Sequence, residues 1–369
     1  MPTYIHEHSD WPNFKWDMDA IAEPLAAVSR RQGRLIGRME ALGFSLREEA
    51  VLRTLTQDVL KSSEIEGETL DADQVRSSIA RRLGMDIGAL TLADRNVEGV
   101  VEMMLDATQN YDQPLTAERL FGWHAALFPT GYSGMNKITV GNWRDDRDGP
   151  MQVVSGPIGR ERVHYEAIAA SDVPAAMKAF LDWFDNAPAI DPVLAAAVSH
   201  LWFVTIHPFE DGNGRAARAI ADMALARSEG TRQRFYSMSA QIRAERSAYY
   251  DMLERTQKGD LDITRWMLWF LACLDRAFDR AEETLAGVLR KAAYWETHGA
   301  QEINDRQRRI VNALLDGFDG HLTSSKYARI TKTSQDTATR DLNALVAKGM
   351  LVKSPAGGRS TSYSLPGPA

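Results

Sequence analysis

Apolar residues recur at helical spacing along most of the chain. Positions three and four residues apart are repeatedly apolar while those between them are polar, which is the pattern of amphipathic helices with one buried face. Capping and helix-breaking residues divide this pattern into helices within the ranges 18–42, 45–67, 71–128 and 173–289. The sequence therefore predicts a mainly α-helical protein.

The pattern changes between Gly141 and Tyr165. Apolar and polar residues alternate from Met151 to Val154 and from Arg162 to Tyr165, with Gly156-Pro157 between the two segments. Alternation with a period of two about such a turn is typical of a β-hairpin. We expect one hairpin within the helical region.

The pattern changes again in the C-terminal residues. Three short helical patterns at 308–315, 324–330 and 334–348 precede two strand-like segments at 350–353 and 361–365. Three helices followed by a two-stranded ribbon are the elements of a winged helix-turn-helix domain, whose third helix is the recognition helix. From Gln301 onward, ten Lys and Arg stand against six Asp and Glu. This region therefore carries +4 of a total charge of −7, which leaves −11 for the residues before it.

A chain of 369 residues is long enough for two or three cores. We expect a helical N-terminal region at 1–110, a second helical region with the hairpin at 111–290, and the winged helix at 300–369. The composition, 44% hydrophobic and 25% charged, is that of a folded soluble protein.

Targeting and redox signals are few. No apolar stretch is long enough to cross a bilayer, and the N-terminus lacks the basic start and apolar run of a secretory signal. A single cysteine, Cys273, excludes an internal disulfide framework. We expect a cytoplasmic protein that does not span a membrane.

Candidate chemistry gathers in HPFEDGNGRAAR, residues 207–218. A helix that begins at Asp191-Pro192 must end or kink at Pro208, and a new helix follows the Gly212-Asn213-Gly214 segment. Glycines at a helix N-terminus leave backbone N–H groups free to bind an anion. Arg215 and Arg218, three residues apart, can add charge-assisted hydrogen bonds to phosphate oxygens.

The same stretch supplies a base and a metal ligand. Asp211 offers carboxylate oxygens of the kind that Mg²⁺ accepts when phosphates and water complete its shell. His207 has an ordinary pKa close to neutrality, which suits a general base. No lysine follows the glycines as in a Walker loop, so the residues favour nucleotide transfer at a different kind of phosphate site.

Residues 207–218 match every defined position of the Fic motif, HxFx[DE]GNGRxxR. The helix 194–206 and the segments 162–166 and 141–144 also resemble Fic proteins, so the resemblance covers roughly residues 115–275. It implies an all-helical Fic domain with a β-hairpin flap, preceded by a helical segment and followed by the winged helix. It also implies a homodimer.

The resemblance implies a protein adenylyltransferase. Such an enzyme moves AMP from ATP to a Tyr, Thr or Ser hydroxyl of a target protein, or of itself, with Mg²⁺ or Mn²⁺. His207 would deprotonate the hydroxyl, Asp211 would hold the metal, and Arg218 would bind the γ-phosphate. The remaining phosphate ligands would be Gly212, Asn213, Gly214 and Arg215.

Further contacts are implied by the same resemblance. The flap, residues 151–165, would dock the target segment by strand addition. Val163 and His164 would edge the nucleotide, and Tyr249 and Tyr250 would lie beside the adenine.

Ser62 to Gly67 fits the family's inhibitory pattern, [ST]xxxE[GN]. Independently of the family, Glu64 and Glu66 end a helix where the helix dipole disfavours negative charge, so each acid is either solvated or paired with a cation. The resemblance supplies a cation: Glu66 would pair with Arg218 and block productive ATP binding. Ser62, one turn before Glu66, would support it. Some relatives also remove AMP from targets.

Two other functions remain open on the sequence. His200, His207 and Asp211 could be ligands of a metal-dependent hydrolase. The chain could instead be a nucleotide-sensing transcription regulator that binds DNA, or a protein, through residues 300–369. Its DNA contacts would then be Thr333, Ser334, Gln335, Thr337 and Arg340, with Arg359 in the wing. Relatives with the same motif also transfer UMP, phosphate or phosphocholine.

Overall fold

The computed structural model describes residues 3–87, 91–147, 149–157, 160–186, 190–318, 320–355 and 361–366. The mainly α-helical class is confirmed: helices dominate, and strands occur only in small hairpins. The helices are α1 (Met18–Glu40), α2 (Phe44–Ile65), α3 (Ala72–Leu83), α4 (Arg95–Gln109), α5 (Ala117–Leu127), α6 (Val173–Asp185), α7 (Pro192–Ile206), α8 (Asn213–Glu229), α9 (Met238–Ala244), α10 (Arg246–Gln257), α11 (Thr264–His298), α12 (Asp305–Leu315), α13 (Ser324–Thr331) and α14 (Gln335–Ala347).

The chain divides into two compact units, Met1–Glu282 and Glu283–Ala369, with the boundary inside α11. The expected N-terminal region, 1–110, lies in the first unit together with most of the expected region 111–290. The expected winged-helix region, 300–369, lies in the second unit.

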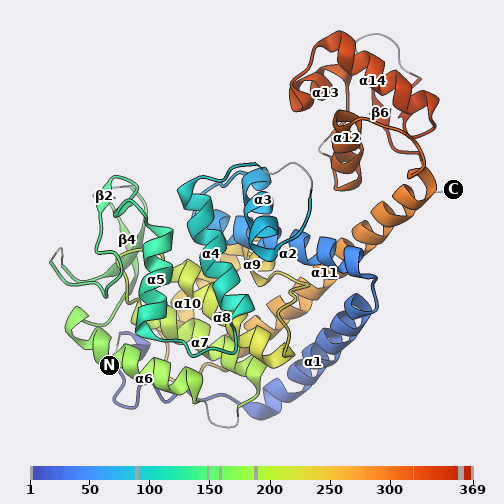
Figure 1. The fold of residues 1–369 in the computed structure, drawn as a ribbon. Coiled ribbons are helices and arrows are strands. Elements are labelled where there is room, and N and C mark those ends of the chain that lie inside the picture. The colour runs from blue at the N-terminus through green and yellow to red at the C-terminus, as the bar shows by residue number, and fades with distance from the viewer. Residues whose placement is uncertain are drawn as a thin grey trace. The chain divides into compact units, whose positions relative to one another are not determined.

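The helix α7 lies in the interior of the first unit. It is buried on every side and packs along α8, while α2, α4, α5 and α9 also contact α8 (Figure 1). A helix that is apolar all round belongs in the interior. Its predicted start is confirmed, because the Asp191 side chain accepts a hydrogen bond from the Val193 N–H and Pro192 is the first helical residue.

The helix α2 brings the predicted inhibitory segment to α8. It begins one residue before the predicted range 45–67, with Gly43 as N-cap, and Glu66 is its C-cap. Gly67 has φ +88°, its N–H donates to the Glu64 carbonyl, and the N–H of Glu68 donates to the Ser63 carbonyl. This pair of bonds is a Schellman motif, which turns the chain sharply after Glu66.

Two hairpins interrupt the helices of the first unit. The predicted one is confirmed: β3 (Gln152–Ser155) pairs antiparallel with β4 (Arg162–Glu166). The register shifts within this pair, since Val153 faces Tyr165 while Val154 faces Val163, so His164 is an extra, bulged residue. The sequence did not indicate the short pair β1 (Tyr132–Ser133) and β2 (Asn136–Lys137).

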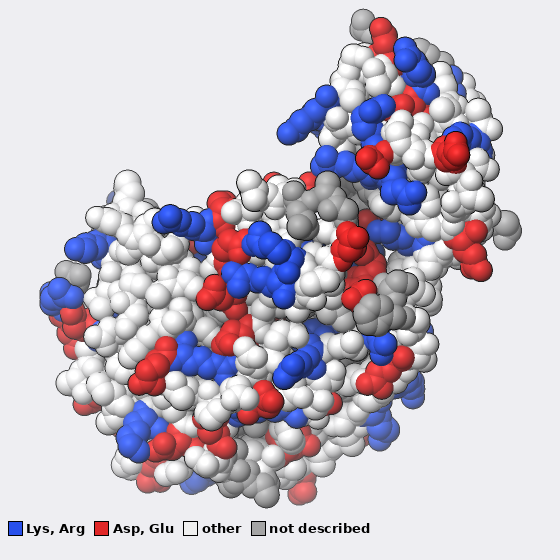
Figure 2. Space-filling view, in the orientation of Figure 1, with Lys and Arg blue, Asp and Glu red and all other residues white. Residues whose placement is uncertain are grey.

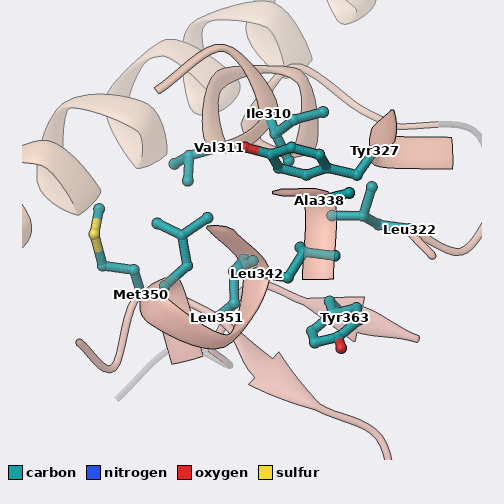
Figure 3. Packing of buried hydrophobic residues seen from close by; sticks show 10 residues of the cluster. Ile310, Val311, Leu322, Tyr327, Ala338, Leu342, Met350, Leu351 and Tyr363 are labelled. Atoms are coloured by element: carbon teal, nitrogen blue, oxygen red, sulfur yellow. The ribbon is translucent and has the colours of Figure 1, made fainter. Parts of the chain in front are cut away.

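The second unit contains α12, α13 and α14, followed by the antiparallel strands β5 (Val352–Lys353) and β6 (Tyr363–Ser364). Their order is that of the predicted elements. The three helices and β6 surround one apolar core (Figure 3), which is built from Ile310, Val311, Leu322, Tyr327, Ala338, Leu342, Leu345, Met350, Leu351 and Tyr363. Arg359, the expected wing residue, lies outside the described residues.

On the face drawn in Figure 2, Lys and Arg side chains lie interspersed with Asp and Glu on both units. None of the helices in the described ranges has the length and apolar character that a membrane crossing requires.

Candidate active site

His207 lies where α7 ends. Its backbone is left-handed, with φ 53° and ψ 58°, and its N–H closes the helix on the Phe203 carbonyl. A non-glycine residue in this conformation costs about 1–3 kcal/mol and persists only where its surroundings fix it. Pro208 then prevents the helix from continuing.

Arg144 holds this strained turn. It is 3% exposed, and its Nε donates to the His207 carbonyl at 2.8 Å while its backbone N–H donates to the Pro208 carbonyl at 2.9 Å. A further guanidinium nitrogen donates to the Ile168 carbonyl. Arg144 is therefore a positioning residue for His207.

The His207 ring is neutral at physiological pH. Burial, aided by the positive charge of Arg144, lowers the pKa of His207 to about 4. The ring Nδ1 lies 3.2 Å from the Val204 carbonyl, which can only accept, so Nδ1 carries the proton. Nε2 is consequently the basic nitrogen, and this tautomer is the one that a general base requires.

The loop after His207 is fixed by Asn213. Its Oδ1 accepts from the Phe209 N–H at 2.9 Å, and its Nδ2 donates to the Phe209 carbonyl at 2.8 Å. Gly212 takes φ +81°, and an added Cβ there would lie 3.0 Å from the Phe128 ring. The Asn213 side chain is thus engaged within the loop, and the N–H groups of the first turn of α8 are those that a helix leaves without internal acceptors.

His124, on α5, holds the backbone of Asp211. Its Nδ1 accepts from the Gly141 N–H at 3.3 Å, so its Nε2 carries the proton and donates to the Asp211 carbonyl at 3.2 Å. Its ring stacks on Phe209 with centroids 4.2 Å apart. Burial lowers the pKa of His124 to about 4, which keeps this neutral tautomer.

The Asp211 carboxylate also has partners of its own. One oxygen accepts from the Gly212 N–H at 2.5 Å, and the other from the Ser133 hydroxyl on β1. Carboxylate oxygens retain further lone pairs, and Mg²⁺ binds proteins through one or two carboxylates when phosphates supply other ligands. The single carboxylate of Asp211 fits that kind of site.

Both arginines of residues 207–218 are buried, and each is paired with an acid just after the C-terminal end of α2. Arg218 is 2% exposed, and its Nη1 lies 2.8 Å from Glu66 Oε1. The Arg215 Nη1 lies 2.7 Å from Glu68 Oε2. Ser62 completes the contact, because Arg218 donates from Nε to its hydroxyl at 3.0 Å and from Nη2 to its carbonyl at 2.9 Å.

Arg215 nevertheless keeps an unsatisfied donor. The Nε of Arg215 has no hydrogen-bond partner in the described residues, although the atom is buried. Unpaired buried donors are costly. This donor fits an anionic ligand such as a phosphate.

The Glu66 side chain pairs with Arg218 and also lies close to the backbone of Gly214. A Cβ added to Gly214 would lie 2.2 Å from Glu66 Oε1 and 3.2 Å from Arg218 Nη1. Only glycine allows the carboxylate to come this close to the backbone of the first turn of α8. Glu66 therefore lies against the groups that a bound anion would contact.

A cavity of about 800 Å³ joins these groups. His207, Asp211, Gly212, Asn213 and Gly214 line one part of it, and Glu66 rather than Arg218 contributes to the wall. The flap contributes residues of β3 and β4, including His164. Val163 is 36% exposed and is not one of the lining residues.

The two tyrosines of α10 differ from each other. Tyr249 is 1% exposed, shares a hydrogen bond of 2.8 Å with His200 Nε2, and packs against Trp269. Tyr250 donates to Glu66 Oε2 at 3.3 Å, and burial raises the pKa of Tyr250 to about 12. Both line the cavity, but Tyr249 is mostly a core residue and Tyr250 reaches the end of α2.

The metal-hydrolase reading is contradicted by the placement of His200. No group of three or more metal-binding side chains comes together in the part of the chain that the structure describes. His200 is 1% exposed, is held by Tyr249, and lies beside Trp266. It belongs to the aromatic core, so the spacing of His200 and His207 along α7 does not make a metal site.

His200 should make folding sensitive to acid. Burial, aided by Arg218, lowers the pKa of His200 to about 3, whereas in the unfolded chain it is close to 6.5. Its contribution to stability is full above pH 6.5 and is lost as the pH falls toward 3, by about 1.4 kcal/mol per pH unit. Urea unfolding at pH 7, 6 and 5 should show a steeper loss for the wild type than for His200→Gln. Parallel pH slopes for the two proteins would contradict the prediction.

These features define a mainly α-helical protein in which a glycine-containing loop leads into the buried helix α8 beside a neutral histidine. Residues 114–225 match the sequence profile of the Fic/DOC family, so the chain contains a Fic domain. Residues 4–85 match a second profile, described as a domain of unknown function, DUF4172.

Curated relatives carry the name protein adenylyltransferase. The chain is 26% identical over 244 residues to fic-1 of Caenorhabditis elegans, covering 64% of this chain and 44% of that protein. It is 26% identical over 274 residues to Fic of Drosophila melanogaster, covering 71% of this chain and 46% of that protein. The chain thus spans less than half the length of these relatives.

Solved structures show the same fold. A Fic family protein from Desulfovibrio desulfuricans superposes with a TM-score of 0.54 at 21% identity, over 95% of this chain and 97% of that one. A Fic domain containing signaling protein from Bacteroides thetaiotaomicron gives 0.52 at 21% identity, over 70% of this chain and 97% of that one.

Proposed function

We propose that the chain is a protein adenylyltransferase that moves AMP from ATP to a Tyr, Thr or Ser hydroxyl of a target protein or of itself. The observation that carries this proposal is the shared cavity, in which the neutral His207 lies with the N-terminus of α8 and with Glu66, the partner of Arg218. The names of the curated relatives support the same activity.

Each residue has a role that its surroundings favour. Nε2 of His207 removes the proton from the incoming hydroxyl. The first turn of α8 and Arg215 bind phosphate oxygens, and Arg218 binds the γ-phosphate. Asp211 would hold Mg²⁺ or Mn²⁺, and the metal would neutralise charge on the phosphates.

We further propose that the protein is autoinhibited by Glu66. Its carboxylate pairs with Arg218 at 2.8 Å and lies over Gly214, so it competes with the γ-phosphate for the same guanidinium. Ser62 fixes Arg218 from the other side. Removal of AMP from a modified target, with Glu66 orienting a water molecule, is the reverse activity that this arrangement would support.

Intact mass tests the reaction type. The Glu66→Gly protein, incubated with ATP and Mg²⁺, should gain the mass of one or more adenylyl groups. Addition of a phosphoryl group instead would contradict adenylyl transfer.

Glu68 should contribute a weaker restraint of the same kind. Its side chain is 46% exposed, and ion pairs of that exposure are worth up to about 1 kcal/mol. We expect Glu68→Gln to free Arg215 and to raise self-adenylylation up to about fivefold. The rate of label incorporation from α-labelled ATP measures this effect. An unchanged rate, with the fold intact by circular dichroism, would limit inhibition to Glu66.

The partners follow from the same proposal. A target segment would add to the exposed edge of the flap, residues 151–165, and two copies of the chain would form a homodimer. Cross-linking through the flap tests the docking of a target segment, and mass measurement in solution tests the homodimer.

A regulator that acts through residues 300–369 is the second candidate. Ser334, Gln335 and Arg340 are exposed at or near the start of α14, where a recognition helix meets DNA. A duplex bound by the whole protein with strong salt dependence would favour this function.

A further inference from the structure

The C-terminal end of α2 carries the carboxylate of the proposed inhibition, and its carbonyl groups are bonded from several directions. Carbonyls at this end of a helix have no partners within it. The turn that follows α2 supplies backbone donors to the carbonyls of Ser63 and Glu64. Arg218, on α8, donates to the Ser62 carbonyl at 2.9 Å. The carbonyl of Ile65, the last helical residue, takes its donor from α10.

Arg246, the first residue of α10, is that donor. Its Nε donates to the Ile65 carbonyl at 2.6 Å. The guanidinium also lies over the ring of Tyr250, 5.0 Å from the ring centroid, and the Tyr250 hydroxyl lies 3.4 Å from the same carbonyl. A charged donor makes a stronger hydrogen bond than a neutral one, and a cation is favoured at a helix C-terminus. Arg246 is therefore well placed to hold the end of α2.

The contacts of Arg246 and Arg218 with α2 differ in kind. Arg218 bonds the Glu66 carboxylate, and in the proposed mechanism it must leave that carboxylate to bind the γ-phosphate. Arg246 bonds a backbone carbonyl, so its contact does not require the carboxylate of Glu66. The bond from Arg246 can therefore keep the end of α2 in place while Glu66 and ATP compete for Arg218.

Arg246 lines the cavity together with Glu66, Tyr250 and the start of α8. The helix end that it holds thus lies at the wall of the proposed nucleotide site. We propose that Arg246 is a positioning residue of the autoinhibition, which holds the C-terminal end of α2 so that Glu66 stays against Arg218. This inference rests on the proposed adenylyltransferase function and on its inhibition by Glu66.

Arg246→Met tests this role, because methionine keeps a long side chain and a similar helix propensity but has no donor. We expect self-adenylylation to rise about 3- to 10-fold, the effect of losing one hydrogen bond. In the Glu66→Gly background the same substitution should change the rate less than about twofold, because no carboxylate is left to position. Incorporation of α-labelled ATP measures both effects.

Arg243, on α9, is the matched control. It also lines the cavity near the end of α2, but it pairs with the Glu64 side chain at 3.3 Å and not with a backbone carbonyl. The two side chains of this pair are 43% and 27% exposed, so their ion pair contributes little. Arg243→Met removes the same charge and should leave the inhibited rate unchanged. Equal activation by the two variants would assign the effect to lost charge and overturn the role of the hydrogen bond.

Amide hydrogen exchange gives a readout that does not depend on catalysis. The N–H groups of Gly67 and Glu68 close the end of α2 on its own carbonyls. Without nucleotide, these two amides should exchange about 3- to 10-fold faster in Arg246→Met than in the wild type, because the helix end opens more easily. The amides of α7 should keep their exchange rates. Unchanged exchange at Gly67 and Glu68 would overturn the inference.

The outcomes distinguish this inference from the proposed function. Activation by Glu66→Gly without activation by Arg246→Met overturns the role of Arg246 and leaves the autoinhibited adenylyltransferase standing. A lower rate of Glu66→Gly/Arg246→Met, with a higher ATP concentration at half the maximal rate, makes Arg246 a nucleotide contact and also overturns its positioning role. No adenylyl transfer and no pyrophosphate release by Glu66→Gly overturns the proposed function, whereas faster exchange in Arg246→Met would still support Arg246 as the residue that holds the end of α2.

Discussion

Glu66→Gly should raise AMP transfer about 5- to 150-fold, the usual range for a coupling between two competing contacts. The substitution removes the carboxylate that lies 2.8 Å from Arg218 and opens the space above Gly214. Glu66 is a C-cap with φ −85° and ψ 1°, so glycine can occupy the position without strain. Incorporation of α-labelled ATP into the protein itself measures the change.

Glu64 offers a matched control for this substitution. It lies in the same last turn of α2 but pairs with Lys61 at 2.7 Å and with Arg243 at 3.3 Å. Glu64→Gly should loosen the helix end by about 1 kcal/mol while leaving the Glu66–Arg218 pair intact. Equal activation by the two variants would attribute inhibition to helix stability and not to the ion pair.

His207→Ala, made in the Glu66→Gly background, should lower the rate of AMP transfer about 10²- to 10⁴-fold. The substitution removes the basic Nε2, whereas the phosphate-binding groups of α8 remain. ATP affinity measured by calorimetry should therefore stay within a few-fold of the parent. A comparable loss of affinity would assign His207 to nucleotide binding.

The pH dependence gives a second check on His207. Because its pKa is lowered to about 4, the neutral base form persists as the pH falls from 8 to 6. We expect the transfer rate of the Glu66→Gly protein to show no acid limb from His207 in that range. A loss of rate centred near pH 6.5 that is attributable to His207 would show that its ring is not desolvated in the working enzyme.

Local sequence patterns were sufficient to predict the helices and the hairpin that carry the site. The end of α7 at Pro208, the hairpin and the turn at Gly67 follow from proline, alternation and glycine, all of which act on the local backbone. The start of α2 was placed one residue late, because Gly43 is the N-cap. Local rules determine where elements lie more reliably than where they end.

Contacts between distant segments could not be predicted in the same way. Arg144, His124 and Ser133 orient His207 and Asp211 from other elements, and nothing in the spacing of HPFEDGNGRAAR indicates them. The bonds of the Asn213 side chain to the Phe209 backbone are likewise not indicated by the motif. Tertiary packing decides which polar groups meet, and the sequence pattern of one element does not contain that information.

The pairing of Arg218 with Glu66 makes the end of α2 a reporter of nucleotide binding. Two anions that compete for one guanidinium are thermodynamically linked, and linkage is reciprocal. The Glu66–Arg218 ion pair weakens the binding of a triphosphate by some factor. If a triphosphate displaces Glu66, its binding must weaken the ion pair, and with it the order of residues 62–68, by the same factor. Amide hydrogen exchange in this segment should therefore accelerate as ATP rises, even in a variant that cannot catalyse transfer.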